Sequence, residues 1–223
     1  MLVASLRGKF ITLEGLEGVG KTTNREVIEH QLTNAGIDYI ATREPGGTPA
    51  GEQLREFVLD TRGTMQAETE LLVMVASRLE LIAQLILPAL EAGKWVLCDR
   101  YMDASVAYQG AGRQLGVERV LQLHSLMGVT LQPDLTILLD MPVEQGLARM
   151  AARGKPDRIE SEAVAFFERA RAAYLARAEA SPARVKVVDA GGALNTVSLA
   201  VADAVQALID ANANANANAN ANR

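Results

Sequence analysis

The chain contains few of the residues that build disulfides or metal sites. Among its 223 residues there are one cysteine and two histidines. Cys98 alone cannot form an intrachain disulfide, and its place in the apolar segment WVLC favours a buried small side chain over a nucleophile. His30 and His124 have no cysteine or histidine neighbour at ligand spacing, so a metal site built on either one is not expected.

Basic stretches and long apolar stretches are also missing. The formal net charge is −5, and no basic segment could follow a nucleic-acid backbone, so no nucleic-acid polymer is expected as a partner. No run of about 18 apolar residues occurs, and we therefore expect no membrane span. The N-terminal segment has too few apolar residues for a signal peptide. These absences together predict a cytoplasmic protein.

What the sequence does contain is an alternation of strand-like and helical segments. The strand candidates are FITLE (10–14), YIATRE (39–44), WVLCDR, LTILLD (135–140) and RVKVVDA (184–190). Strands that alternate with helices predict an α/β fold, here with five parallel strands flanked by helices. Ligands of such a sheet bind at the carboxyl ends of the strands.

The last residues differ in composition from the rest. The segment ANANANANANANR (211–223) is a two-residue repeat without large apolar side chains, so it cannot bury a core. We therefore predict one domain over residues 1–210, followed by a disordered tail without a function of its own.

The clearest motif is GLEGVGKTT (15–23), which matches the phosphate-binding pattern G-x-x-x-x-G-K-[ST]. Its glycines let backbone N–H groups approach phosphate oxygens, Lys21 adds a positive charge, and the Thr22 hydroxyl can bind Mg²⁺. A strand precedes the motif, and the helical pattern TNREVIEHQLTNAG (23–36) follows it. The motif predicts a bound nucleoside triphosphate, but leaves open whether water, a protein or a small molecule accepts the phosphate.

The segment DRYMDASVAYQGAGR (99–113) suggests an acceptor. Asp99 ends a strand and can hold Mg²⁺ through water, while the Arg100 guanidinium can bind a second phosphate, which a hydrolase does not need. Tyr108 and Gln109, with the glycines around them, offer a ring and an amide that could contact a nucleobase. The alternative is an ordinary polar loop after a strand.

Two further arginines are candidates for the same site. Arg43 lies in TREPGGT (42–48), where a Pro-Gly-Gly turn fixes it. Arg78 lies within a long apolar helix predicted over 67–93, where it is either a solvated charge or a residue that points into a site.

A basic loop follows later in the chain. The segment ARMAARGKPDRIE (148–160) carries Arg149, Arg153, Lys155 and Arg158 around a glycine and a proline. Such a loop can close over transferring phosphates and exclude water, or it can be a solvated connection between two helices.

These motifs, together with PDLTILLDMPVEQ and VDA, resemble bacterial thymidylate kinase in their order and spacing, from about Lys9 to about Leu208. The resemblance implies a P-loop nucleoside monophosphate kinase-like fold with a basic lid at about 149–160. It also implies Mg²⁺-dependent transfer of phosphate from ATP to dTMP, which gives ADP and dTDP on the way to dTTP. The family is commonly a homodimer through the helix matched here by 67–93.

The resemblance also implies roles for individual residues. The catalytic residues would be Lys21, Asp99, Arg100 and Arg153, with Arg153 stabilising the transferring phosphoryl group from the lid. The ATP site would comprise Gly15, Gly18, Val19, Gly20, Lys21, Thr22 and Thr23, and the metal ligands would be Thr22 and Asp99. The dTMP site would comprise Glu17, Arg43, Pro45, Met74, Arg78, Arg100, Ser105, Tyr108 and Gln109.

Within the implied dTMP site, the family pattern assigns separate contacts. Glu17 would approach the 3′-hydroxyl, Tyr108 would lie against the sugar, and Arg43 and Arg100 would bind the phosphate. Arg78 and Gln109 would contact the thymine edge. The family usually has an aromatic residue about four positions before this arginine, where the present chain has Met74 and Val75. A methionine can cover a base, but it stacks less well than a ring.

Three other functions are compatible with the P-loop alone. A kinase for another nucleoside monophosphate, such as dUMP, is left open by the missing ring, although the Arg78–Gln109 pair favours thymine or uracil. A P-loop GTPase switch would require an N-K-x-D motif, which the sequence lacks. A catalytically dead nucleotide-binding protein would not need Lys21, Asp99 and Arg153.

Overall fold

A computed structural model describes residues 8–152 and 157–221, and it contains one parallel sheet. The strands are β1 (Phe10–Glu14), β2 (Tyr39–Arg43), β3 (Trp95–Asp99), β4 (Leu135–Asp140) and β5 (Val185–Asp189). Their order across the sheet is β2-β3-β1-β4-β5, and every neighbouring pair is parallel. The predicted five-stranded parallel sheet is confirmed.

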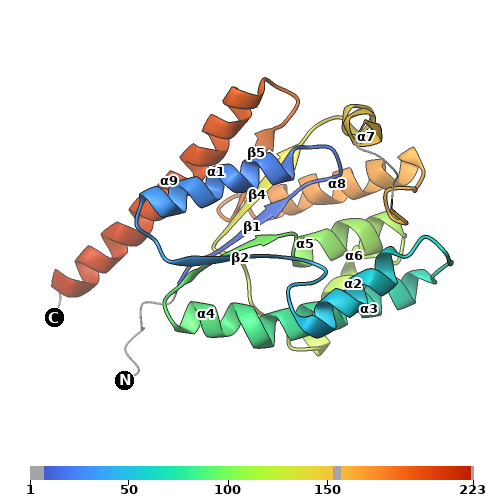
Figure 1. Ribbon diagram of the computed structural model, residues 1–223, viewed down its shortest axis with the longest axis horizontal. Coiled ribbons are helices and arrows are strands. Elements are labelled where there is room, and N and C mark those ends of the chain that lie inside the picture. The colour runs from blue at the N-terminus through green and yellow to red at the C-terminus, as the bar shows by residue number, and fades with distance from the viewer. Residues whose placement is uncertain (1–7, 153–156, 222–223) are drawn as a thin grey trace.

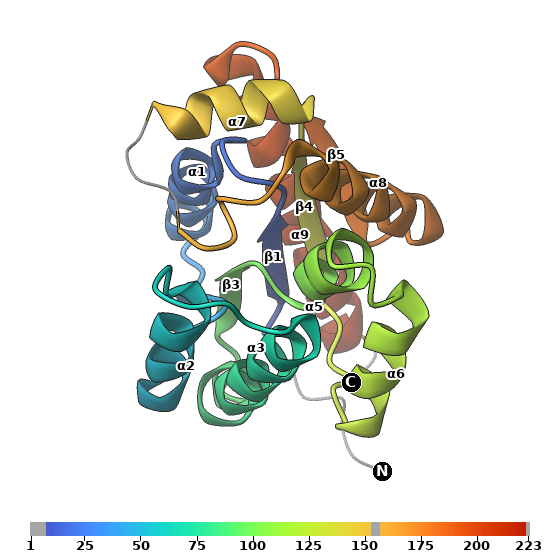
Figure 2. The same cartoon turned by 90° about the vertical axis from the view of Figure 1, so that its right-hand side faces the viewer.

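Helices cover both faces of this sheet. α1 (Lys21–Asn34) and α9 (Leu194–Ala221) pack together on one face, and α7 (Val143–Ala151) follows β4 (Figure 1). The other helices are α2 (Pro49–Leu59), α3 (Ala67–Leu81), α4 (Leu87–Glu91), α5 (Met102–Ser105), α6 (Val117–Leu126) and α8 (Val164–Ala180). Two π-helical segments, η1 (Ile82–Ile86) and η2 (Val106–Gly112), continue α3 and α5. Figure 2 shows α3, α5, α6 and α8 gathered in front of the strands.

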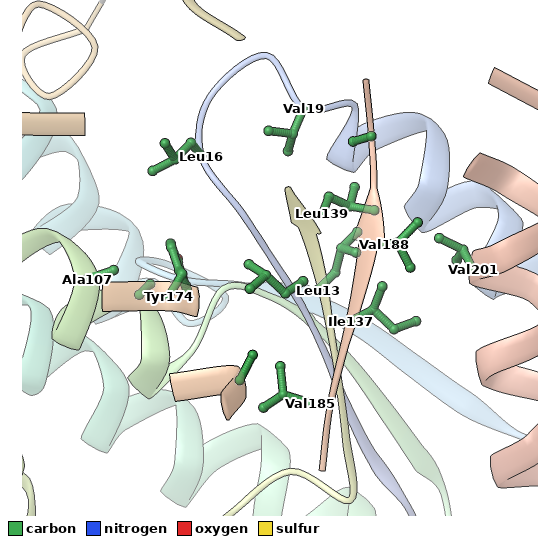
Figure 3. Packing of buried hydrophobic residues seen from close by; sticks show 14 of the residues in the cluster. Leu13, Leu16, Val19, Ala107, Ile137, Leu139, Tyr174, Val185, Val188 and Val201 are labelled. Carbon is green, nitrogen blue, oxygen red and sulfur yellow. The ribbon is translucent and has the colours of Figure 1, made fainter. Parts of the chain in front are cut away.

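The core lies on both sides of the central strands. Figure 3 shows Tyr174 from α8 and Ala107 from η2 on one side of β1 and β4, and Val201 from α9 on the other. Strands buried on both faces need apolar side chains at nearly every position, which explains the continuous runs FITLE and LTILLD. The carboxyl ends of the strands are thereby held together at one edge of the sheet.

Two helices are long and apolar enough to cross a membrane by length and composition alone, Ala67–Glu91 and Leu194–Ala219. The first carries Glu70 and Arg78, both fully buried in ionic contacts within the protein. The second packs its first turns against β4 and β5. Helices that pack on the sheet in this way are core elements of the fold.

The tail differs from the expected disorder, because α9 continues through residues 211–221. Val197, Val201 and Val205 are buried against the sheet and fix the first turns of this helix. Once a helix has formed, adding a residue costs little, and alanine has the highest helix propensity. The Ala-Asn repeat therefore extends a helix that the core has already nucleated.

The segment after β3 is helical as well, where a polar loop was the alternative. A Cβ on Gly112 would lie 2.6 Å from the Phe166 ring of α8, and one on Gly110 would lie 3.3 Å from Val117 of α6. These glycines let neighbouring helices approach η2 closely.

Candidate active site

The loop between β1 and α1 has a shape that only glycines allow. Gly15, Gly18 and Gly20 have φ angles of 133°, 76° and 90°, in a region that side-chain-bearing residues rarely adopt. A Cβ on Gly15 would lie 2.4 Å from the Leu139 carbonyl oxygen, and one on Gly18 would lie 1.9 Å from that of Gly146. α1 begins directly after the loop, so its free N–H groups face the ligand side.

This loop opens into a cavity of about 660 Å³ at the carboxyl edge of the sheet. Many of the predicted site residues line it: Glu17, Gly18, Gly20, Lys21, Thr22 and Thr23 from the loop and α1, and Pro45, Met74, Asp99, Arg100, Tyr108 and Gln109 from elsewhere. The phosphate-binding loop and the Tyr108–Gln109 pair therefore line the same cavity.

Lys21 is folded back onto its own loop. Its Nζ donates to the carbonyl oxygens of Gly15, at 3.1 Å, and Leu16, at 2.9 Å. Burial, followed by the nearby Arg100 charge, lowers the pKa of Lys21 to about 8. Asp99, Glu17 and Glu14 act in the opposite direction and partly offset this lowering of the pKa.

Arg100 follows β3 and lines the cavity. Its Nη2 donates to Glu17 at 2.7 Å and its Nη1 donates to the Gly15 carbonyl oxygen at 3.0 Å. Its guanidinium carbon lies 4.8 Å from the centre of the Tyr108 ring. The residue has a φ of 69°, which is uncommon for a residue other than glycine. Its Nη1 also donates to the Tyr174 hydroxyl at 3.4 Å, and the residue lines the cavity.

Glu17 links Arg100 to Tyr108. The Tyr108 hydroxyl donates to the Glu17 carboxylate at 2.8 Å and 2.9 Å. Arg100 forms a salt bridge with the same carboxylate. The three predicted residues are therefore in direct contact.

Asp99 and Thr22 are the predicted metal ligands, and both line the cavity. Asp99 Oδ1 is buried and has no hydrogen-bond partner among the described residues. Oxygen ligands suit Mg²⁺, which usually retains water and binds substrate phosphates through one or two protein oxygens. Within residues 8–152 and 157–221, no group of three His, Cys, Asp or Glu side chains could hold a metal. The residues present therefore fit Mg²⁺ held jointly with phosphates.

Gln109 and Met74 also line the cavity. Gln109 Nε2 donates to the buried Glu70 carboxylate at 2.8 Å. Gln109 Oε1 is buried, and no other described group donates to it. A buried amide oxygen without a donor is costly unless a ligand supplies one.

Arg78 is predicted to contact the base. It is fully buried beside the cavity, and every N–H donor is used within the protein. Nε and Nη2 donate to Glu44, and Nη2 also donates to the Tyr101 carbonyl oxygen at 3.0 Å. Nη1 donates to Ser105 Oγ at 3.0 Å and to His124 Nε2. The contact of Arg78 with a thymine edge stays a prediction, because in this structure its donors bind protein acceptors and Ser105 is buried against it.

Arg43 also lies away from the cavity. Its guanidinium pairs with Glu52 at 2.9 Å on the surface. Arg55 of α2 lines the cavity instead, and its Nη1 donates to the Pro45 carbonyl oxygen at 3.0 Å. Arg55 follows the TREPGGT segment by two turns of helix and belongs to no motif, so sequence reasoning missed it.

The remaining loop predictions have mixed outcomes. Val19 is buried in the core, and Gly15 contributes its carbonyl oxygen to Lys21 and Arg100 while lying outside the cavity lining. Arg153 and Lys155 lie outside the described residues. Arg149 lines the cavity and donates to the Ala190 carbonyl oxygen at 3.2 Å.

Arg158, the fourth cation of the predicted lid, is turned away from the cavity. Its Nη2 donates to Glu70 at 2.7 Å and its Nε donates to the Val58 carbonyl oxygen at 2.8 Å. Its neighbours Asp157, Ile159 and Glu160 line the cavity. The C-terminal half of the predicted lid thus lies beside the cavity and is anchored through Arg158.

Comparison with known proteins places these features in one family. The sequence profile described as thymidylate kinase matches residues 13–201. The chain is 49% identical over 207 residues to the thymidylate kinase of Ectopseudomonas mendocina, covering 92% of this chain and 99% of that protein. It is 50% identical over 204 residues to that of Bordetella petrii, covering 92% and 98%. A crystal structure of thymidylate kinase from Ehrlichia chaffeensis matches with a TM-score of 0.73 and 30% identity, over 90% of this chain and 99% of that one.

Proposed function

Because the chain belongs to the thymidylate kinase family, we propose roles for its cavity residues in that family's reaction. The protein transfers the terminal phosphoryl group of ATP to dTMP, giving ADP and dTDP. The observation that carries the assignment of the site is the single cavity that holds both the P-loop and the Tyr108–Gln109 pair. A donor and an acceptor nucleotide can meet there with their phosphates beside Arg100.

The donor phosphates lie over the P-loop. Backbone N–H groups of Gly18 and Gly20 and the N-terminus of α1 face them, and Lys21 exchanges its loop carbonyl partners for phosphate oxygens. The Thr22 hydroxyl and the unpaired Asp99 Oδ1 would hold Mg²⁺ together with those oxygens. Mg²⁺ bound there would neutralise negative charge on the phosphates.

The acceptor phosphate lies beside Arg100 and Arg55. Both guanidinium groups line the cavity, and a guanidinium binds two phosphate oxygens at once. Glu17 orients Arg100, and its carboxylate is placed to accept a hydrogen bond from the sugar 3′-hydroxyl. The Tyr108 ring lies beside this carboxylate, where it limits the space for the sugar. From the lid, Arg153 stabilises the phosphoryl group during transfer.

The base lies against Met74 and Gln109. Thymine carries a hydrogen on N3, and Gln109 Oε1 is a buried acceptor that needs a donor. Cytosine has no hydrogen on N3, so its N3 would face Gln109 Oε1 with two lone pairs opposed. Gln109 therefore supplies base selectivity in this proposal, while Met74 covers the base face.

A homodimer through α3 and α4 is part of the proposal. Leu72 and Leu87 on these helices, and Val117 and Leu126 on α6, are large apolar side chains exposed to solvent. A second copy would cover them, and the molecular mass in solution tests this. A cytoplasmic location fits the supply of ATP and the unpaired thiol of Cys98.

A coupled ADP-release assay over dTMP, dUMP and dCMP tests the function. We expect dTMP to be the best acceptor and dUMP to follow by about 10–200-fold in kcat/KM, since it lacks only the methyl group. We expect dCMP to be about 10⁴-fold worse, because its N3 leaves Gln109 unpaired. Comparable activity on dUMP and dTMP would favour a kinase of broader acceptor range, and no activity on any of them would contradict the assignment.

A further inference from the structure

Glu70 is a buried carboxylate that lies outside the cavity lining and directly behind one of its walls. It lies in the first turn of α3 and is fully buried. It accepts hydrogen bonds from Gln109 Nε2 at 2.8 Å, from Arg113 Nε at 3.1 Å and from Arg158 Nη2 at 2.7 Å. Burial raises the pKa of Glu70, but these hydrogen bonds and charges outweigh it and hold the pKa below its usual value. Glu70 is therefore a carboxylate that stays ionised.

We propose that Glu70 is a positioning residue that sets the base preference by fixing the orientation of the Gln109 amide. An ionised carboxylate can only accept hydrogen bonds, so Gln109 must present its NH₂ group to Glu70. The amide oxygen of Gln109 then has to face the opposite way, where it is buried without a donor from any other described residue. Glu70 thereby determines that Gln109 presents a hydrogen-bond acceptor, and not a donor, to the base. This inference rests on the proposed function.

The same carboxylate also connects the base site to the lid. Arg158, bound to Glu70, directly precedes Ile159 and Glu160 of the cavity lining. Arg113, the other cationic partner, also pairs with Glu162. The segment 157–162 and the Gln109 amide therefore share one anchor, and a change at Glu70 should alter acceptor recognition more than ATP binding.

The arginines make the effect of one isosteric substitution predictable. Arg113 and Arg158 have only donors, so in Glu70→Gln they will hold the carbonyl oxygen of the new amide. The new NH₂ group then faces Gln109, and Gln109 must turn its own oxygen toward it. The NH₂ group of Gln109 would consequently face the base, where it can donate to N3 of cytosine but opposes N3–H of thymine.

The test compares kcat/KM for dTMP and dCMP in the wild type and in three variants of the full-length protein. Glu70→Gln should lower the dTMP-to-dCMP ratio by about tenfold or more, through loss on dTMP and gain on dCMP, with KM for ATP little changed. Glu70→Asp retains an acceptor-only group and should keep the ratio even where overall activity falls. Glu68→Gln alters an exposed carboxylate on the same turn and should change neither.

Two results would overturn the inference alone. One is a dTMP-to-dCMP ratio in Glu70→Gln that equals the wild-type ratio, while the variant still binds and phosphorylates dTMP. The other is an equal fall of the ratio in Glu70→Asp, which would mean that packing and not hydrogen-bond polarity is responsible. A wild-type enzyme inactive on dTMP would instead remove the proposed function, and the inference with it. Circular dichroism and the Kd values for dTMP and dCMP show whether each variant is folded and which base it binds.

Discussion

Arg78 and Arg100 show how differently two arginines beside one cavity can be used. Arg78 is fully buried, and all its N–H groups are paired with protein acceptors from two helices and two loops. Arg100 lines the cavity and is held by Glu17, a loop carbonyl oxygen and the Tyr108 ring. A phosphate can replace the carbonyl contact of Arg100, but no ligand can reach Arg78 without dismantling its partners.

The difference separates a structural from a functional cation. Arg78 joins Glu44 at the end of β2 to Ser105 of α5 and His124 of α6, so it holds the cavity wall in place. Arg100 lines the cavity and has an uncommon backbone conformation, and such conformations cluster at functional sites. Hydrogen-bond saturation therefore distinguishes the two better than proximity to the cavity does.

The largest expected effect is on folding, in Arg78→Met. Removing one partner of a buried ion pair leaves the Glu44 charge without compensation, which costs about 3–5 kcal/mol. Urea unfolding should show this loss. Arg62→Met, in the exposed pair with Asp60, is the matched control and should change the free energy of unfolding very little. Full stability in Arg78→Met, accompanied by loss of thymine selectivity, would return Arg78 to the ligand site.

Arg100→Lys should lower activity and leave stability nearly unchanged, in contrast to Arg78→Met. The variant retains the positive charge but loses the planar guanidinium that can bind two phosphate oxygens. We expect kcat/KM for dTMP to fall roughly 10²–10³-fold, as when one positioned donor to a transition state is removed. The free energy of unfolding should remain close to that of the wild type. A loss of stability as large as in Arg78→Met would show that Arg100 is structural as well.

The comparison also explains what the sequence could predict. The strands and the P-loop arise from local patterns, namely continuous apolar runs and fixed glycine spacing, and both were found. The partners of Arg78 lie 23 to 46 residues away in sequence, and no local pattern encodes them. Arg55 and Glu70 were missed for the same reason, since each acquires its role only through long-range contacts.

The tail shows a different limit of local reasoning. The repeat at 211–221 has no apolar side chain to bury, and composition alone therefore indicates disorder. Its helical state depends on the packed valines at the beginning of α9, which lie outside the repeat. A prediction from the segment itself could not include that contribution.

The smallest expected effect is a dependence of stability on pH that originates in the Arg78 cluster. Burial, followed by the Arg78 charge, lowers the pKa of His124 to about 4. Nδ1 lies 2.7 Å from the Val120 carbonyl oxygen and donates to it, so Nε2 is free to accept from Arg78 only while the ring is neutral. Above the unfolded pKa of about 6.5, the ring is neutral in both states and its contribution to stability is complete. As the pH falls toward 4, the unfolded chain binds a proton that the folded protein excludes, and stability decreases by up to about 3 kcal/mol.

Urea unfolding at a series of pH values tests this, with His124→Gln as the informative variant. A glutamine amide can still accept from Arg78 but does not titrate, so stability should decline less between pH 6.5 and 4 than in the wild type. His30→Gln removes an exposed histidine of α1 and should leave the decline unchanged. Equal declines in the wild type and in His124→Gln would mean that the imidazole is not held neutral by Arg78. Burial, followed by the Asp103 charge, raises the pKa of Glu14 beside Arg100 to about 8, so Glu14 contributes a pH dependence of the opposite sign. Glu14 is present in both proteins, and the difference between the wild type and His124→Gln therefore isolates the imidazole.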